Sequence, residues 1–267
     1  MPCPMSESPT SQGTLTGRAI LITRPAAQAE QLARLVVEAG GEPIVFPTLE
    51  IEPLALSPHA AALLARLDAF DLAVFVSSNA VIHGVALIRA AGGWRAGLRA
   101  VAVGAATAAA LRAQGIDQVV APQLGADSEA LLALPEMQAV RGLRVIVFRG
   151  AGGRELLAET LRRRGAEVQY IECYRRLKPR TDPGALRRRL RDAGLLDAVT
   201  AASAEALANL LELVGPDAPT VLTLPLFVTH DNIARAAARL GFRVIRVSGP
   251  GDEGLLRGML SYFSSSG

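Results

Sequence analysis

Landmarks in this sequence recur about 125 residues apart, and this internal repeat constrains the fold more than any other feature of the chain. Arg24 and Arg149 each follow an apolar run, and they lie 149 − 24 = 125 residues apart. Further pairs share this spacing to within one residue: Gly40 with Gly165, Asp71 with Asp197, Ser77 with Ser203, and Val101 with Phe227. The repeat therefore predicts a duplicated unit, and hence two similar domains.

Each copy of the repeat alternates strand patterns with helix patterns. The apolar runs Ile20–Thr23 and Asp71–Val76 are typical of buried parallel strands. Between residues 28 and 39, apolar residues fall three and four apart, which predicts a helix that ends at Gly40. Strands that alternate with helices favour a parallel sheet covered on both faces, so the predicted class is α/β with two doubly wound domains.

Composition excludes several classes of partner. With 267 residues, 50% of them hydrophobic, the chain can bury a large core. No apolar run approaches the length of about 18 residues that a membrane span needs, so no membrane is expected. Aromatic residues make up 4%, which leaves little for nucleic-acid bases to stack on. The arginine runs 162–164 and 187–189 fit either solvated helix faces or a surface that attracts anions.

The N-terminal segment and the cysteines bear on location and on metals. Residues 1–13 are rich in Ser, Pro and Thr and lack the apolar core of a signal peptide, so we expect a disordered tail over residues 1–17 and a cytoplasmic protein. Cys3 and Cys173 make neither a disulfide framework nor a metal cluster. The histidines are far apart, so no metal site is expected: His59, His83 and His230.

Small polar residues follow the predicted strands, where open parallel sheets bind their ligands. The ends of strands and the starts of helices carry Arg24, Ser77, Ser78, Asn79, Gly104, Thr107, Ser128, Arg149, Ser203 and His230. Helix N-termini at such an edge favour a polyanionic ligand, although each residue taken alone can be an ordinary cap or turn. The copies differ here, because Gly104–Thr107 becomes His230–Ile233 and Leu49 becomes Tyr174.

Familiar catalytic and nucleotide motifs do not occur. Gly150–Gly153 matches a dinucleotide loop only loosely, and no Walker sequence is present. No Gly-x-Ser-x-Gly elbow or paired Cys and His supports covalent catalysis. An enzyme with this sequence is therefore expected to act mainly by positioning its substrate.

Five motifs in order resemble the uroporphyrinogen-III synthase family, over about Arg18 to Leu260. They are Ile20–Pro25, Phe75–Val81, Val103–Gly104 with Thr107, Ser128–Leu131 and Tyr174–Arg175. The turn His230–Asn232 departs from the Gly-Pro-Thr type often seen in the family. The resemblance implies two flavodoxin-like domains joined by a two-stranded antiparallel linker, with a cleft between them. The expected domains are 18–51 with 177–267, and an inserted domain over 52–176.

The resemblance also implies a reaction: cyclisation of linear hydroxymethylbilane to uroporphyrinogen III, with inversion of ring D and loss of water, in tetrapyrrole biosynthesis. It implies a monomer that needs no cofactor or metal. The substrate carries carboxylates that suit helix N-termini, and its last pyrrole must form a spiro intermediate, so positioning can contribute roughly 7 to 11 kcal/mol. Tyr174 is the candidate general acid, or alternatively a packed ring at a hinge.

A non-catalytic sensor or scaffold that binds a small anion on the same fold is the alternative. Formation of the type III isomer from hydroxymethylbilane distinguishes the two, because spontaneous closure yields type I.

Overall fold

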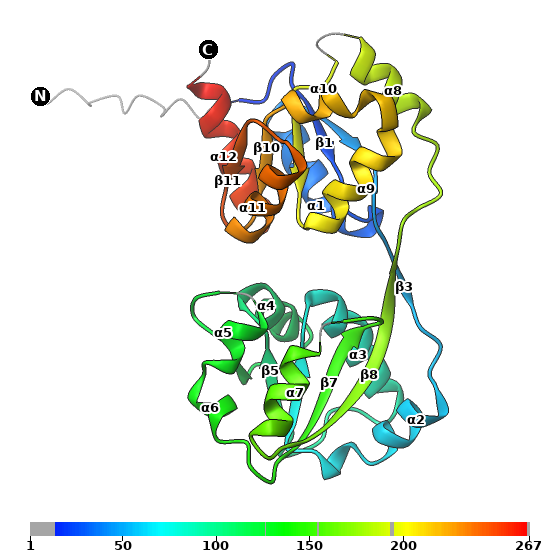
Figure 1. Ribbon diagram of the computed structural model, residues 1–267, viewed down its shortest axis with the longest axis vertical. Coiled ribbons are helices and arrows are strands. Elements are labelled where there is room, and N and C mark those ends of the chain that lie inside the picture. Colours follow the sequence, from blue (N-terminus) through cyan, green and yellow to red (C-terminus); the bar gives the residue numbers. More distant parts are fainter. Residues whose placement is uncertain (1–13, 126, 154, 193–194, 266–267) are drawn as a thin grey trace, which may run out of the picture. The chain divides into compact units, whose positions relative to one another are not determined.

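A computed structural model describes residues 14–125, 127–153, 155–192 and 195–265 of the chain. The chain divides into two compact units (Figure 1). Unit 1 comprises Met1–Glu50 and Lys178–Gly267, and unit 2 comprises Ile51–Leu177.

Unit 1 is a doubly wound parallel sheet with strand order β11-β10-β9-β1-β2. Its strands are β1 (Ala19–Ile22), β2 (Glu42–Val45), β9 (Ala198–Ala201), β10 (Leu226–Val228) and β11 (Ile245–Val247). Helices α1 (Ala26–Glu38) and α12 (Gly251–Ser264) pack on one face. The other face carries α8 (Gly184–Arg191), α9 (Ala204–Val214), α10 (Ala218–Thr223) and α11 (Asp231–Leu240), with the 3-10 turn η2 (Gly215–Asp217).

Unit 2 repeats this arrangement, with strand order β3-β8-β7-β4-β5-β6. Its strands are β3 (Glu50–Pro53), β4 (Leu72–Phe75), β5 (Arg99–Ala102), β6 (Val119–Val120), β7 (Arg144–Gly150) and β8 (Glu167–Leu177). One face carries α2 (Pro58–Ala65), the 3-10 turn η1 (Leu67–Ala69), α3 (Ser78–Ala90) and α4 (Ala105–Ala113). The other carries α5 (Ser128–Leu132), α6 (Pro135–Gln138) and α7 (Leu156–Arg163).

The two sheets confirm the predicted α/β class and follow the spacing of the sequence repeat. The order β2-β1-β9-β10-β11 in unit 1 matches β8-β7-β4-β5-β6 in unit 2, strand for strand. Counted along the chain, unit 1 has the flavodoxin-like order 2-1-3-4-5, and unit 2 has the same arrangement in a permuted chain order, 5-4-1-2-3 without the edge strand β3. Its topological switch point lies between β1 and β9 in unit 1, and between β7 and β4 in unit 2.

Strand β3 adds an antiparallel edge to the sheet of unit 2, beside β8 (Figure 1). The Leu54 N–H donates to the Cys173 carbonyl over 3.2 Å, and Arg175 pairs with Glu52 at 2.8 Å. Residue numbers rise on one strand as they fall on the other, which is the antiparallel register. These two strands are where the chain enters unit 2 and leaves it.

The expectation of a disordered tail over residues 1–17 is wrong for its last four residues. Leu15 is fully buried in the core between β1, α1 and α12, and its N–H donates to the Ala39 carbonyl over 2.8 Å. Burial of this apolar side chain and the backbone hydrogen bonds of Leu15 together favour an ordered turn before β1. Residues 1–13 lie outside the described part of the chain.

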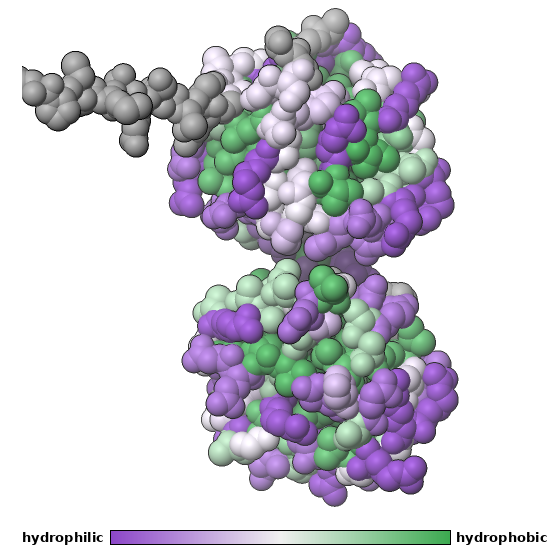
Figure 2. Space-filling model, turned by 90° about the vertical axis from the view of Figure 1, so that its left-hand side faces the viewer, coloured by the Kyte–Doolittle hydropathy of each residue, from purple (hydrophilic) through white to green (hydrophobic). Residues whose placement is uncertain are grey.

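The surface mixes polar and apolar groups. On the face that Figure 2 presents, apolar side chains are interspersed with polar ones. Within the described ranges, the large apolar residues that are exposed are Val37, Val45, Leu56, Ile82, Leu124, Leu177, Leu195 and Val247. Within the described residues, no helix combines the length and the apolar character that crossing a bilayer demands.

Candidate active site

The site begins at the switch point of the sheet in unit 2. Ser77 follows β4 and Arg149 lies near the end of β7, so the two residues flank the point where the strand order reverses. In flavodoxin-like sheets, ligands bind beyond the carboxyl ends of the strands at this point. A cavity of about 220 Å³ opens here, and its lining includes Ser77, Ser128, Arg149 and Tyr174. Unit 2 thus brings together four residues that the sequence singled out.

Tyr174 is held firmly in this cavity wall. Its side chain is 3% exposed, and its hydroxyl lies 3.0 Å from Ser77 Oγ. Its ring stacks on the His83 ring with centroids 5.8 Å apart. Gly150 lies opposite Tyr174 at an irregularity in the pairing of β7 with β8, and a Cβ there would lie 2.7 Å from Tyr174 Cζ. The tyrosine therefore depends on a glycine across the sheet.

Ser77 is the N-cap of α3, where its Oγ accepts the Ala80 N–H over 3.0 Å. Ser78 and Asn79 are the first residues of this helix. The helix starts here because a serine hydroxyl satisfies one of the N–H groups that lack a partner within the helix.

Gly104 and Thr107 lie on the next helix along the same edge. Gly104 is the N-cap of α4 with extended backbone, and Thr107 is 4% exposed within the first turns of that helix. Ser128 opens the short helix α5, which is capped by Asp127 through a hydrogen bond to the Ala130 N–H. Of these three predicted residues, Ser128 lines the cavity.

The remaining predicted residues belong to unit 1 and lie at the carboxyl edge of its own sheet. Arg24 follows β1 and forms an ion pair with Asp252 of α12. Ser203 caps α9 and accepts the Ala206 N–H over 3.1 Å. His230 is the N-cap residue of α11, and its side chain makes no capping hydrogen bond. Arg24 and Ser203 flank the switch point of unit 1 as Arg149 and Ser77 flank that of unit 2.

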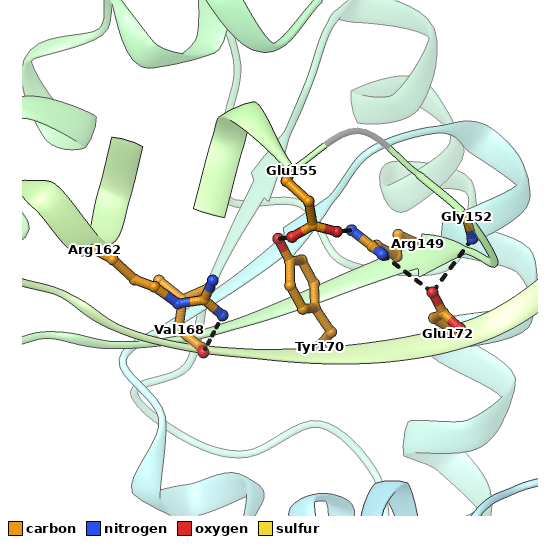
Figure 3. A network of polar contacts seen from close by, with 7 residues as sticks. All are labelled: Arg149, Gly152, Glu155, Arg162, Val168, Tyr170 and Glu172. Carbon is orange, nitrogen blue, oxygen red and sulfur yellow. Dashed lines mark hydrogen bonds and ion pairs between the residues drawn. The ribbon is translucent and has the colours of Figure 1, made fainter. Parts of the chain in front are cut away.

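Arg149 is the centre of a network of charges that Figure 3 shows. Arg149 is 8% exposed, and its guanidinium forms ion pairs with Glu155 Oε1 at 2.7 Å and Glu172 Oε1 at 3.1 Å. The guanidinium carbon also lies 4.1 Å from the centre of the Tyr170 ring, a cation–π contact. Among the described residues, the buried Nε of Arg149 has no hydrogen-bond partner. One donor of this arginine therefore stays unsatisfied beside the cavity.

The network shifts the titration of its members. Burial tends to lower the pKa of Arg149, but its hydrogen bonds to Glu155 and Glu172 raise it overall. Hydrogen bonds from Tyr170 and Arg149 hold the pKa of Glu155 below its usual value. Burial, together with Glu155, raises the pKa of Tyr170 to about 12. At neutral pH, Arg149 is therefore charged, Glu155 is ionised and the Tyr170 phenol is neutral.

Sequence reasoning missed Glu155, Tyr170 and Glu172. Arg149 pairs with Glu172 in the register of β7 with β8, so the two side chains share one face of the sheet. Tyr170 lies two residues before Glu172 on the same strand, and its hydroxyl donates to Glu155 over 2.8 Å. The two-residue period of a strand places Tyr170 and Glu172 on one face of the sheet. The strand register, which sequence alone does not supply, selects Glu172 as the partner.

Among the residues that the structure describes, this edge offers neither a cluster of metal ligands nor an exposed thiol. Among the described residues, no group of three or more His, Cys, Asp or Glu side chains is arranged to hold a metal ion. Cys173 is buried, and burial raises the pKa of its thiol to about 12. A thiol with that pKa is almost entirely protonated at neutral pH and is a poor nucleophile.

A larger hollow, of about 540 Å³, lies at the opposite edge of the same sheet. Its lining includes Trp94, Arg95 and Asp117, near the start of β5 and before β6. Volume alone favours this hollow. However, it is at the amino ends of the strands and contains none of the predicted site residues, so the smaller cavity is the better candidate.

The two arginine runs serve mainly structural contacts. Arg162 and Arg164 donate to backbone carbonyls over 2.9 to 3.1 Å. Arg187 forms an ion pair with Asp217 at 2.7 Å, and Arg189 pairs with Glu42 at 2.7 Å. These contacts favour the interpretation of the runs as helix faces over a free anion-attracting surface.

Two doubly wound units, with a small cavity at the switch point of one of them, define a two-unit α/β protein with a candidate site for a small molecule. The family model described as "Uroporphyrinogen-III synthase HemD" matches residues 30–257. The chain belongs to the uroporphyrinogen-III synthase family, and it is therefore an enzyme, a cyclising lyase.

Curated relatives agree with this assignment, and solved structures share the fold. The uroporphyrinogen-III synthase of Salmonella typhimurium is 35% identical over 90% of this chain and 99% of its own length. That of Escherichia coli K12 is 33% identical with the same coverage. The fold is similar to uroporphyrinogen III synthase from Thermus thermophilus, with a TM-score of 0.64 at 20% identity over 93% of this chain and 99% of the other. The Helicobacter pylori enzyme gives 0.53 at 14% identity over 92% and 99%.

Proposed function

We propose that this chain converts linear hydroxymethylbilane into uroporphyrinogen III, with inversion of ring D and release of water. The observation that carries the proposal is the cavity at the switch point of unit 2, whose lining includes both Tyr174 and Arg149, in a chain of this family.

Tyr174 is the proposed general acid. Its proton passes to the hydroxyl of the substrate, the C–O bond breaks and water leaves, so the carbon that carried the hydroxyl becomes electrophilic. The last pyrrole attacks this carbon through its substituted position and forms a spiro intermediate, which rearranges to the inverted ring. Tyr174 suits this role because its hydroxyl is held by Ser77 and its ring is fixed by packing.

Arg149 is the proposed contact for one carboxylate of the substrate. Its buried Nε–H lacks a partner among the described residues, and an unsatisfied buried donor costs free energy until a ligand accepts from it. Glu155 and Glu172 hold the guanidinium in place. A charge-assisted hydrogen bond from Arg to a carboxylate contributes about 1.5 to 3 kcal/mol.

The other substrate contacts are proposed from their places at the carboxyl edges of the two sheets. Helix N-termini there present N–H groups and a partial positive charge to anions. The residues concerned are Arg24, Ser77, Ser78, Asn79, Gly104, Thr107, Ser128, Ser203 and His230.

We also propose that the protein acts as a monomer in the cytoplasm. The buried free thiol of Cys173 is compatible with a reducing compartment. Sedimentation of the purified protein and fractionation of cells test these two points.

The decisive experiment supplies hydroxymethylbilane and separates the oxidised products by chromatography. We expect enrichment of the type III isomer over the type I isomer of spontaneous closure. Type I alone would overturn the enzymatic proposal and favour a protein that only binds an anion. Tyr174→Phe should lower turnover substantially while circular dichroism shows an intact fold, and wild-type rates in this variant would leave Tyr174 with a packing role.

A further inference from the structure

The hydroxyl of Ser77 takes part in two hydrogen bonds at once. Its Oγ accepts the Ala80 N–H over 3.0 Å, and it lies 3.0 Å from the Tyr174 hydroxyl oxygen. A serine hydroxyl has one hydrogen to donate and two lone pairs to accept with. Capping uses a lone pair, so the hydrogen is free to point at the phenolic oxygen.

The helix behind Ser77 adds to the effect of this hydrogen bond. Helix α3 has 13 residues, and its N-terminus carries a partial positive charge that favours an anion nearby. Tyr174 is 3% exposed, so water does not readily replace Ser77 as its partner. A phenolate formed at Tyr174 would therefore be stabilised by Ser77 and, through it, by the start of α3.

Other polar groups approach Tyr174 from several elements. His83 of α3 stacks on its ring, and burial lowers the pKa of His83, so this imidazole is neutral at the pH of most assays. The titratable and charged groups that share the cavity lining with Tyr174 are Asp127, Arg149, Tyr170 and Arg176. Ser77 is the group whose hydrogen bond to the Tyr174 hydroxyl the structure defines.

Comparison of the two units distinguishes the role of the serine as a helix cap from its contact with Tyr174. Ser203 corresponds to Ser77 in unit 1, where it caps α9 in the same way, with its Oγ 3.1 Å from the Ala206 nitrogen. The position that corresponds to Tyr174 is Leu49, which is 7% exposed and has no hydroxyl. The cap is therefore common to both units, whereas the pairing of the cap with a phenol is particular to unit 2.

We propose that Ser77 is a positioning residue for Tyr174: it donates its O–H to the phenolic oxygen, so that the Tyr174 proton points into the cavity and the phenolate is stabilised once that proton has left. The inference rests on the proposed function. As the phenolic O–H bond breaks, the new O–H bond forms on the leaving hydroxyl, which departs as water. After the spiro intermediate rearranges, the unsubstituted α-carbon of the last pyrrole forms the bond that closes the macrocycle, and the proton that this carbon then loses restores the phenol.

The test compares Ser77→Ala with Ser77→Thr and with a matched control, Ser57→Ala. Ser57 caps α2 with the same geometry, Oγ to the Ala60 nitrogen at 3.1 Å, but it does not line the cavity of Tyr174. Loss of either cap should lower Tm by a similar amount, about 2 to 4 °C. Only Ser77→Ala should lower kcat for the type III isomer, by about 10 to 100-fold with KM changed less than about twofold. Ser77→Thr keeps the hydroxyl and should restore kcat to within about threefold.

Two further readouts exclude a purely structural role. Without Ser77 the phenolate loses a donor, so the basic limb of the pH profile of kcat should move upward by about one unit. In a Tyr174→Phe background, Ser77→Ala should have no further effect on kcat. Equal kcat in Ser77→Ala and Ser57→Ala, with no shift in the basic limb of the pH profile of kcat, would overturn the inference about Ser77. The proposed function would still stand in that case if the wild type forms the type III isomer. Failure of the wild type to form type III would overturn the proposed function itself.

Discussion

Replacing Gly150 with alanine places a methyl group against the ring of Tyr174. The added Cβ would lie 2.7 Å from Tyr174 Cζ and 2.8 Å from Cε2. Gly150 is not among the described glycines with positive φ, so alanine brings no backbone strain and the effect is purely steric. Because Tyr174 is 3% exposed and stacked on His83, the ring cannot move without disturbing its neighbours.

The size of the effect follows from these distances. An ordinary contact needs about 3.4 Å, so the ring must retreat by about 0.7 Å from its position 2.7 Å away. A shift of that size can lengthen the distance from Ser77 Oγ to the Tyr174 hydroxyl from 3.0 Å to about 3.7 Å, beyond hydrogen-bond range. Overpacking should cost about 1 to 3 kcal/mol of stability. Misplacement of the acid should lower kcat by about 10 to 100-fold.

Gly84→Ala is the matched control. A Cβ on Gly84 would lie 2.7 Å from Phe148 Cδ1, an equal clash in the same core that falls on Phe148 and not on Tyr174. Urea unfolding should show similar losses of stability in both variants, whereas the rate of type III formation should fall mainly in Gly150→Ala. Equal kcat in the two variants at equal stability would refute the reasoning that the position of Tyr174 sets the rate.

Two further predictions concern Arg149 and Cys173. Arg149→Met should raise KM for hydroxymethylbilane by about tenfold, since one charge-assisted contact is lost. The control is Arg162→Gln, which should change KM less than about twofold, because the native Arg162 guanidinium donates to the Val168 carbonyl. An unchanged KM in Arg149→Met would remove this arginine from the substrate site. In a Cys3→Ser variant, native Cys173 should not react with a disulfide reagent at pH 8, because burial raises its pKa to about 12 from an ordinary value of 9.0. Rapid labelling of Cys173 in the native protein would contradict its burial. The pKa of the Cys173 thiol is higher in the folded than in the unfolded protein, so the free energy of unfolding should fall as pH rises from about 9 towards 12.

The architecture was largely predictable because its signals are local or repeated. The caps at Ser77 and Ser203 are where the sequence places them, since a serine that begins a helix satisfies N–H groups only three residues away. The repeat then extends this local information to the whole chain. Leu15 was missed because a single apolar residue within a polar segment has no periodic pattern, and only the core that it fills shows its role.

Sequence by itself determined the family, the duplicated α/β class and most of the residues at the strand ends. Only the tertiary structure decided which of them meet. Ser77 and Tyr174 are 97 residues apart, and their contact depends on the order of β4, β7 and β8 in the sheet. The pairing of Arg149 with Glu172, and the place of Gly150 against Tyr174, follow from a strand register with one irregularity. A register is settled by the packing of both faces of a sheet at once, and no local stretch of sequence contains that information.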